Sequence, residues 1–192
     1  HNLASVLSTL GEFDASETAL LAAEALIRPM GDLKALADLR LDFGVLAEER
    51  GDFPAALAAY REALSLHLQG SDPDAVADSL LSVGFAYYQM GDFVNAELHW
   101  QQADQRSRDA GDLFGMVRAQ QSLGLAYAAR GDFAKARASF QQSLEVAEQN
   151  QMGEERAIAE AALGEQDRLE GKLARAKIHA ERALGLFEER ED

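Results

Sequence analysis

One decapeptide returns along this chain at a fixed interval of 40 residues. Residues 51–60 read GDFPAALAAY, residues 91–100 read GDFVNAELHW, residues 131–140 read GDFAKARASF and residues 171–180 read GKLARAKIHA. A constant period of this length is typical of a solenoid, in which each structural unit packs only against its neighbours. The periodicity therefore limits the possible folds more than any other feature of the sequence.

A turn signal divides each period into two halves. The full period is set by glycines at five positions, Gly11, Gly51, Gly91, Gly131 and Gly171. A second series of turn residues lies half a period away, at Gly31 and Asp32, Ser71 and Asp72, and Gly111 and Asp112. Because a turn arrives every 20 residues, each unit is predicted to consist of two helices.

The Gly-Asp pair has a physical reason to recur at these turns. Glycine has no Cβ, so it ends a helix in the left-handed conformation at little cost. The aspartate that follows can accept hydrogen bonds from the free N–H groups of the next helix, and its charge suits the positive end of that helix. Pro54 and Pro73 fall in the first turns of predicted helices, where a missing N–H group costs least.

Between the turns, apolar residues recur three and four positions apart, as in Leu57, Tyr60 and Leu64. This spacing is typical of amphipathic helices, and the alanine-rich stretches have high helix propensity. The pattern predicts an all-α fold of ten helices, over residues 3–10, 14–28, 34–49, 54–69, 74–90, 94–109, 113–129, 134–149, 154–169 and 174–189.

The composition excludes several classes of function. The 192 residues carry a net charge of -15, and nucleic-acid binding by this segment is not expected because it needs a cationic surface. No apolar run approaches the roughly 20 residues of a membrane span. The sequence has no cysteine, which excludes thiolate metal sites and is compatible with a cytoplasmic location. The chain begins at His1 rather than Met, so it is either trimmed or a fragment of something longer.

The sequence offers no catalytic motif. It contains no HExxH pattern, no phosphate-binding glycine loop and no nucleophile elbow. The four histidines are expected on surfaces or helix flanks, without a carboxylate cluster around them: His1, His67, His99 and His179. The chain is therefore predicted not to be an enzyme and to bind no metal or cofactor.

The spacing within each unit is more specific than that of a simple helix pair. Small and aromatic residues keep one order in three units: Gly44, Ala47, Gly51, Ala56, Tyr60 and Ala63; then Gly84, Tyr87, Gly91, Ala96, Trp100 and Ala103; then Gly124, Tyr127, Gly131, Ala136, Phe140 and Ser143. This order resembles the tetratricopeptide repeat, in the long form found in kinesin light chain and in bacterial regulators.

The resemblance implies a right-handed α-solenoid of antiparallel helix pairs in a single domain over residues 1–192. Its units would cover residues 1–30 (incomplete), 31–70, 71–110, 111–150 and 151–192, with Ala4 where the first small glycine belongs. The last unit has Asp167 in the tyrosine slot and Ala180 in the aromatic slot, which predicts a polar or underfilled groove. Terminal repeats are expected to be atypical in this way.

One departure bears on binding. Long-repeat adaptors of this family often have asparagine directly after the small glycine of the first helix, where it binds a peptide backbone. That place here holds Val45, Phe85, Leu125 and Glu165. The resemblance therefore does not carry over peptide binding through a ladder of asparagines.

In the family, the first helix of each pair lines the concave face of the solenoid. First-helix residues off the packing stripe are thus expected to bind a partner, and the candidates are Asp38, Asp78, Leu81, Phe85, Tyr88, Arg118, Gln121 and Arg168. Tyr88 is equally compatible with binding and with packing on the next unit, whereas packing is favoured for Phe85 and Leu125. The aromatic residues of the motif slots, Trp100 among them, are expected in the core.

These patterns favour a protein–protein interaction scaffold that holds a peptide or helix of a partner in its groove. An apolar and aromatic centre with an acidic side suits a partner that carries basic and apolar residues, although the acidic residues could simply be solvated helix faces. One alternative is an effector-sensing domain of a larger bacterial transcription regulator or signalling ATPase. Another is self-association as a homodimer.

Overall fold

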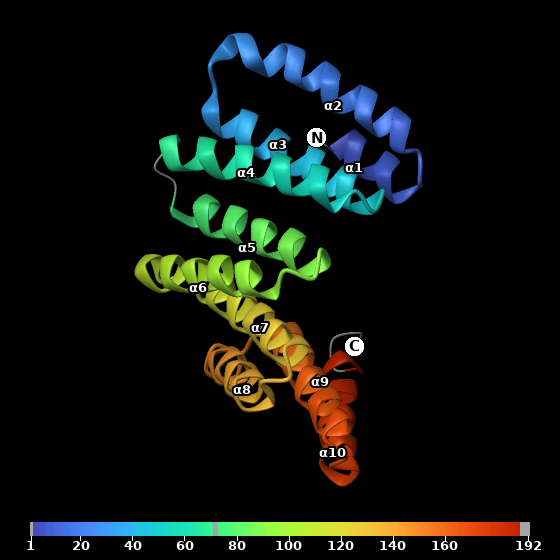
Figure 1. Ribbon diagram of the computed structural model, residues 1–192, viewed down its shortest axis with the longest axis vertical. Coiled ribbons are helices and arrows are strands. Elements are labelled where there is room, and N and C mark those ends of the chain that lie inside the picture. Colours follow the sequence, from blue (N-terminus) through green and yellow to red (C-terminus); the bar gives the residue numbers. More distant parts are fainter. Residues whose placement is uncertain (1, 71–72, 189–192) are drawn as a thin grey trace. The chain divides into compact units, whose positions relative to one another are not determined.

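The computed structural model describes residues 2–70 and 73–188, which form ten α-helices and one short 3-10 helix and contain no strand (Figure 1). The helices are α1 (Asn2–Thr9), α2 (Phe13–Ile27), α3 (Leu33–Glu49), α4 (Phe53–Gly70), α5 (Pro73–Gln89), α6 (Phe93–Ala110), α7 (Leu113–Ala129), α8 (Phe133–Gln149), α9 (Gly153–Leu169) and α10 (Leu173–Glu188), with the 3-10 helix η1 at Arg28–Met30. The predicted all-α fold is confirmed, and no helix end differs from its predicted position by more than one residue.

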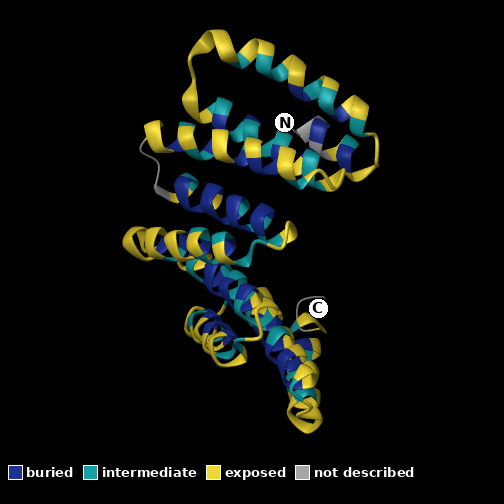
Figure 2. Ribbon diagram, viewed as in Figure 1, coloured by how far each residue is buried: buried dark blue, intermediate teal, exposed yellow. Residues whose placement is uncertain are grey.

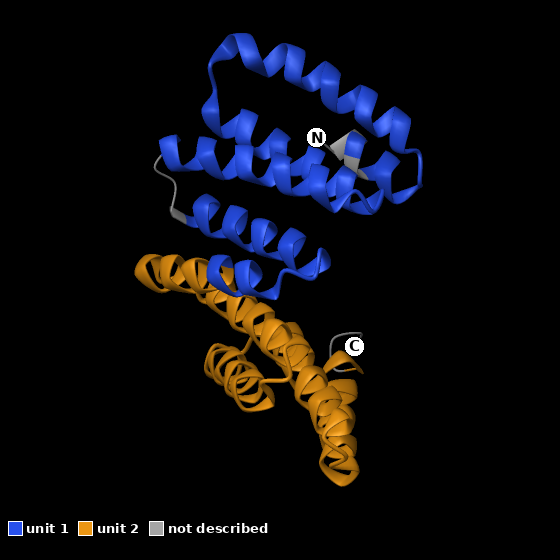
Figure 3. Cartoon of the chain, in the orientation of Figure 1, with its two compact units in different colours: residues 1–99 blue, residues 100–192 orange. Residues whose placement is uncertain are grey.

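Consecutive helices pack as pairs, and neighbouring pairs within a compact unit contact each other. The pairs α1 with α2, α3 with α4, α7 with α8 and α9 with α10 are in direct contact. The second helix of one pair also contacts the first helix of the following pair, as α4 contacts α5 and α8 contacts α9. The chain divides into two compact units, residues 1–99 and 100–192, with the boundary inside α6 (Figure 3). The single domain inferred from the repeats stays a prediction.

The turns have the chemistry that the sequence predicts. Seven turn glycines have positive φ, namely Gly11, Gly31, Gly51, Gly91, Gly111, Gly131 and Gly171. Where aspartate follows the glycine, it caps the next helix, as where Asp52 Oδ1 accepts a hydrogen bond of 3.0 Å from the Ala55 amide. Glu12 follows Gly11 instead, and its side chain makes no capping hydrogen bond. The turn predicted at residues 71–72 lies outside the described residues.

Gln151 occupies a turn position where a glycine would be favoured. Its φ is 56°, the one positive value among the described residues other than glycine. A Cβ in this conformation costs about 1 kcal/mol. Gln151→Gly is therefore expected to raise the free energy of unfolding by about 1 kcal/mol in urea titrations. Gln151→Ala keeps the Cβ and should give no comparable gain; equal effects of the two substitutions would show that backbone strain is not the cause.

The aromatic slots of the second helices lie in the core, as predicted, whereas Tyr127 of a first helix is only half-buried. Tyr60, Trp100 and Phe140 are each 2% exposed. The small glycines let the paired helices approach, because a Cβ on Gly124 would lie 2.3 Å from Phe140 Cε1. Figure 2 shows these buried positions along the inner sides of the helices, with exposed residues at the turns and on the outer sides.

None of the helices in the described part of the chain is long and apolar enough to cross a membrane. The cytoplasmic location stays a prediction.

Candidate partner-binding surface

The candidate residues of α5 share one face of that helix. Asp78, Leu81, Phe85 and Tyr88 follow one another three, four and three positions apart, which places them in one stripe. Asp78 is exposed and the two aromatic residues are half-buried. Leu81 is only 5% exposed and so offers little surface to a partner. The Tyr88 ring packs against Phe93, with ring centroids 5.4 Å apart, so Tyr88 has a packing role whether or not it also binds.

The matching stripe of α3 lies beside that of α5, because these two helices contact each other. Val45 of this stripe is 45% exposed, although it is a large apolar residue on an ordered helix. Val45 and Phe85 hold the same repeat position, directly after the small glycine. Asp38 and Asp78 share another repeat position two turns earlier. The face of α3 and α5 thus combines an apolar row with an acidic row.

Asp38 is the first member of a chain of polar contacts that runs from a carboxylate through a histidine to a serine. This is the order of groups in a catalytic triad. Asp38 Oδ1 lies 3.4 Å from His67 Nε2, and His67 Nδ1 is 2.8 Å from Ser79 Oγ. However, His67 is 2% exposed and Ser79 is fully buried, so the hydroxyl cannot reach a substrate. The expectation that His67 lies on the surface is wrong: helix contacts between α4 and α5 bury it, and the serine satisfies its ring.

Asp42 is half-buried on the same helix as Asp38. Its burial, with the charge of Asp38 added, raises its pKa to about 6. The folded protein therefore holds this proton more tightly than the unfolded chain does. The contribution of Asp42 to stability is complete below the ordinary carboxyl pKa of 3.8 and is lost as the pH rises through about 6.

Asp42→Asn is accordingly expected to flatten the dependence of unfolding free energy on pH between 3.8 and about 6. Urea titrations at several pH values in this window measure the effect. The exposed residue Gln89 of α5 provides the control, because Gln89→Ala removes no titratable group and should leave the slope as it is in the wild type. A slope unchanged in Asp42→Asn would contradict the burial of this carboxyl group.

In the second unit, α7 carries the corresponding candidates. The Arg118 guanidinium lies over the Phe114 ring, 5.5 Å from its centroid, and Gln121 Nε2 donates a hydrogen bond of 3.3 Å to the Glu155 carbonyl of α9. Gln121 therefore also holds two first helices together. The expectation that Leu125 packs inside is wrong, since it is 46% exposed. Leu125 holds the same repeat position on α7 as Val45 holds on α3.

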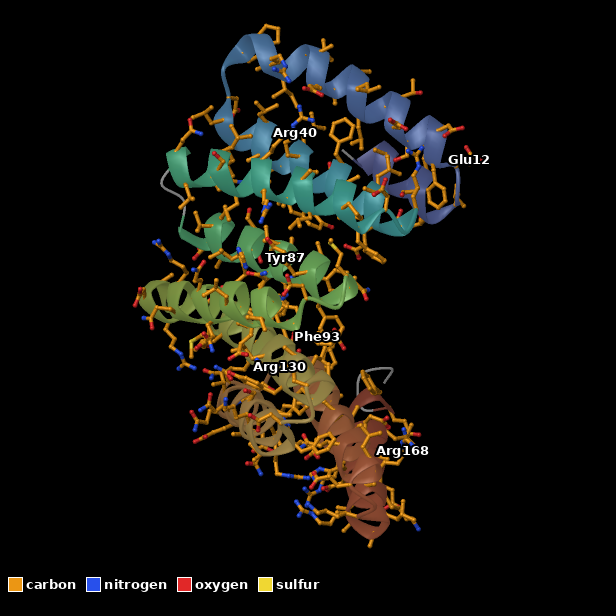
Figure 4. The ribbon with its side chains drawn as sticks, in the orientation of Figure 1. Glu12, Arg40, Tyr87, Phe93, Arg130 and Arg168 are labelled. Atoms are coloured by element: carbon orange, nitrogen blue, oxygen red, sulfur yellow. The ribbon has the colours of Figure 1, made fainter. Side chains whose placement is uncertain are left out.

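The basic spot expected at Arg168 is largely neutralised. Arg168 Nε and Nη2 each donate a hydrogen bond of 2.6 Å to Glu165, one helical turn earlier on α9. This pairing lowers the pKa of Glu165, chiefly through the hydrogen bond from Arg168. Figure 4 labels Arg168 on this helix.

Sequence reasoning missed two exposed apolar residues on these stripes. Phe114 is 49% exposed and Ile158 is 42% exposed. Phe114 precedes Arg118 by one helical turn, and Ile158 has the repeat position of Arg118 on α9. Extending each stripe by one turn, and comparing every unit at the same repeat position, would have found both residues.

The last pair of helices has a buried ionic cluster in place of the usual aromatic residues. Asp167 is fully buried and accepts a hydrogen bond from Arg137 of α8, while its Oδ2 lies 3.3 Å from Arg175 Nε. His179 of α10 pairs with Glu160, a carboxylate that is 4% exposed. The polar groove expected here is present, but the expectation of no carboxylate cluster around a histidine is wrong. Local sequence does not reveal the cluster because three helices supply it.

The cluster continues to the end of α9 through Glu170. Hydrogen bonds from Lys172 and Arg137 lower the pKa of Glu170 to about 2. The pairs of this carboxylate therefore persist at mildly acidic pH. Within residues 2–70 and 73–188, no group of three or more histidine, aspartate or glutamate side chains is placed to hold a metal ion.

Comparison with known proteins gives a consistent result. Residues 75–149 match the family model of the tetratricopeptide repeat. No curated protein matches the chain. The solved structure of BtubC (BKLC) from P. vanneervenii has a TM-score of 0.83 at 19% identity, over 98% of this chain and 78% of that one.

Two further solved structures are similar to this chain. Aspartyl phosphate phosphatase F from Bacillus subtilis has a TM-score of 0.89 at 13% identity, over 98% of this chain and 50% of that one. A signal transduction ATPase with numerous domains and a tetratricopeptide repeat sensor, from Pyrococcus horikoshii, has a TM-score of 0.76 at 18% identity, over 85% of this chain and 26% of that one. At these identities the likeness concerns the fold alone.

Proposed function

We propose that this chain, whose residues 75–149 match the tetratricopeptide repeat, is a scaffold that binds a peptide or helix of a partner protein on the face of its first helices. The observation that carries the proposal is the exposure of apolar side chains at one repeat position of the first helices. Val45 and Leu125 remain 45% and 46% exposed, and the half-buried Phe85 holds the same repeat position. Exposed apolar residues in a row, bordered by charge, are typical of binding surfaces.

The chemistry of the surface favours a partner with basic and apolar residues. On α3 and α5 the apolar row lies beside the acidic residues Asp38 and Asp78. The net charge of -15 attracts a cationic partner over distances of a Debye length and speeds its association. Apolar anchors would then supply most of the affinity, as they do in other interfaces. In the second unit, Arg118 and Gln121 would make the polar contacts.

A display library of random peptides tests the proposal without a known partner. Selection on the wild-type chain is expected to enrich peptides that combine lysine or arginine with large apolar residues. The double variant Asp78→Lys with Tyr88→Ala should lose at least about tenfold in affinity for them. The control Leu98→Ala with Asp109→Lys makes the same change in charge at exposed positions of α6 and should bind as the wild type does.

Two results would contradict this proposal. Enrichment of no sequence class over an unrelated protein would remove the binding function. Equal losses in the two double variants, with both proteins folded by circular dichroism, would remove the first-helix face as the site.

A second candidate is an effector-sensing domain within a larger regulator. It is favoured by the likeness to the repeat sensor of the Pyrococcus horikoshii ATPase, in which a domain of this fold is one part of a longer chain. The sequence of the complete reading frame separates the two candidates. A nucleotide-binding loop or a helix-turn-helix domain on the same polypeptide favours the sensor, whereas further repeats alone favour the scaffold.

A further inference from the structure

The tyrosine slot holds tyrosine in only two of the four complete repeats. In chain order it holds Ala47, Tyr87, Tyr127 and Asp167. Around Tyr87, the Arg61 guanidinium lies 5.3 Å from the ring centroid and the His99 ring lies 5.3 Å away. Around Tyr127, Lys135 Nζ lies 5.2 Å from the ring centroid. The slot is therefore a place where a phenol ring packs against a cationic side chain from a neighbouring helix.

Ala47 leaves this slot without a ring, and a cavity of about 450 Å³ opens there between α2, α3 and α4. The wall supplied by α4 consists of small residues, Ala55, Ala58 and Ala59. In the next 40-residue repeat, His99 occupies the position of Ala59 and packs against the Tyr87 ring. The first complete repeat thus has alanine at both positions, and both alanines line the cavity.

Arg40 of α3 and Arg50, which directly follows α3, line the cavity and connect it to the adjacent helices. Arg40 donates a hydrogen bond to Glu24 of α2, and its Nε lies 2.9 Å from Glu62 Oε2 of α4 (Figure 4). Arg50 Nη1 donates to Glu17 Oε2 of α2 at 2.7 Å. The two arginines stand ten residues apart, or about 15 Å along the helix. Fixed cationic groups therefore stand on either side of the empty slot.

We propose that this cavity binds an aromatic side chain of a partner peptide in which basic residues flank the aromatic one. The chain itself places a phenol ring in the same slot of the next two units, beside a cation. The volume lies within the range of small-ligand sites and exceeds what one ring requires. The cavity lining has more carboxylates than arginines: Glu17, Asp52 and Glu62 against Arg40 and Arg50. This excess of negative charge favours basic residues next to the aromatic residue of the bound peptide.

This site is separate from the proposed face of the first helices. Arg40, Ala47 and Arg50 lie on one side of α3, whereas Asp38 and Val45 lie on the opposite side, because each residue advances about 100° around a helix. Substitutions in the cavity therefore leave the other face intact. Failure of one proposal would not entail failure of the other.

Nuclear magnetic resonance titration of the isotopically labelled full chain tests the inference with three probes. They are p-cresol, a capped Lys-Tyr-Lys peptide and a capped Glu-Tyr-Glu peptide. The Lys-Tyr-Lys peptide is expected to bind with a dissociation constant on the order of 1 mM and to shift the amides of Ala55, Ala58 and Ala59. The Glu-Tyr-Glu peptide should bind at least about fivefold more weakly.

Ala47→Tyr fills the slot with the ring that the next units already have. It is expected to weaken Lys-Tyr-Lys binding at least about tenfold without lowering the thermal midpoint, whereas Ala47→Ser should bind within about twofold of the wild type. Ala59→His narrows the cavity from α4 and provides a second test if Ala47→Tyr does not fold. Unchanged affinity in the folded filled variant, binding of p-cresol as tight as that of Lys-Tyr-Lys, or shifts confined to other helices would each overturn the proposal.

Discussion

Asp167→Ala is expected to lower the free energy of unfolding by about 3–5 kcal/mol, the typical cost of breaking a buried ion pair by removing one partner. Asp167 is fully buried, and the side chain of Arg137 that it accepts from is 17% exposed. The substitution would leave this guanidinium with Glu170 alone and would also remove the carboxylate that faces Arg175. Urea unfolding followed by circular dichroism measures the loss.

The repeat itself supplies the matched rescue variant. Other units have Leu57 in the place of Arg137 and Tyr87 in the place of Asp167, and both residues are buried there. Replacing a whole buried ion pair by apolar residues is often neutral or stabilising. Arg137→Leu with Asp167→Tyr is therefore expected to recover most of the lost stability, with the new ring against His179 as Tyr87 lies against His99. A double variant as unstable as Asp167→Ala would contradict this account of the cluster.

Gly124→Ala should produce the second large effect, a loss of about 1–3 kcal/mol from overpacking. The added Cβ would lie 2.3 Å from Cε1 and 2.6 Å from Cδ1 of the Phe140 ring. The ring has little freedom to move, because Phe140 is 2% exposed and packs against Ala136 and Leu163. The paired helices α7 and α8 would have to separate, which loosens the contact that defines the repeat.

The control is the same substitution at a glycine that nothing crowds. Gly185 lies inside α10, and a Cβ there would meet no atom within 4 Å. Gly185→Ala should therefore raise stability by about 0.5–1 kcal/mol through helix propensity alone. Gly124→Ala with Phe140→Leu should cost less than the sum of its two single substitutions. Additive losses, or a gain from Gly124→Ala, would show that the ring does not limit the helix approach.

The helices and turns could be predicted closely from the sequence because their causes are local. Gly51 takes a left-handed conformation with a φ of 75°, and Asp52 caps the helix that follows, so each boundary depends on neighbouring residues only. The 40-residue period then repeats this local information, which makes every unit a check on the others. The burial of these aromatic residues could be predicted in the same way, since Tyr60 and Phe140 occupy the same position of the repeat and are equally buried.

The parts that sequence reasoning missed depend on which helices meet. His67 is buried because α5 covers it and offers Ser79, a partner twelve positions away. His179 meets Glu160 through the pairing of α9 with α10. Ala47 could be recognised in the tyrosine slot, but its consequence, a cavity, requires knowing that α2 and α4 border that slot. Side-chain environments between helices were therefore less predictable than the helices themselves.

The candidate surface was predicted in part. The stripe positions on α5 followed from helical spacing, yet the degree of exposure of each residue did not. Leu81 turns inward at 5% exposure while Leu125 remains 46% exposed, although both are leucines on a first helix. The difference arises from the neighbours that cover each position. Whether these residues bind a partner stays a proposal.

Site-specific photo-cross-linking tests the central claim, that partners bind on the face of the first helices, most directly. Benzoylphenylalanine would replace Val45 on α3 or Leu98 on α6, residues that are 45% and 47% exposed, and each protein would be irradiated with the peptides enriched by display. We expect adducts at position 45 and few at position 98. Adducts at position 98 alone, or equal yields at both positions, would contradict the account.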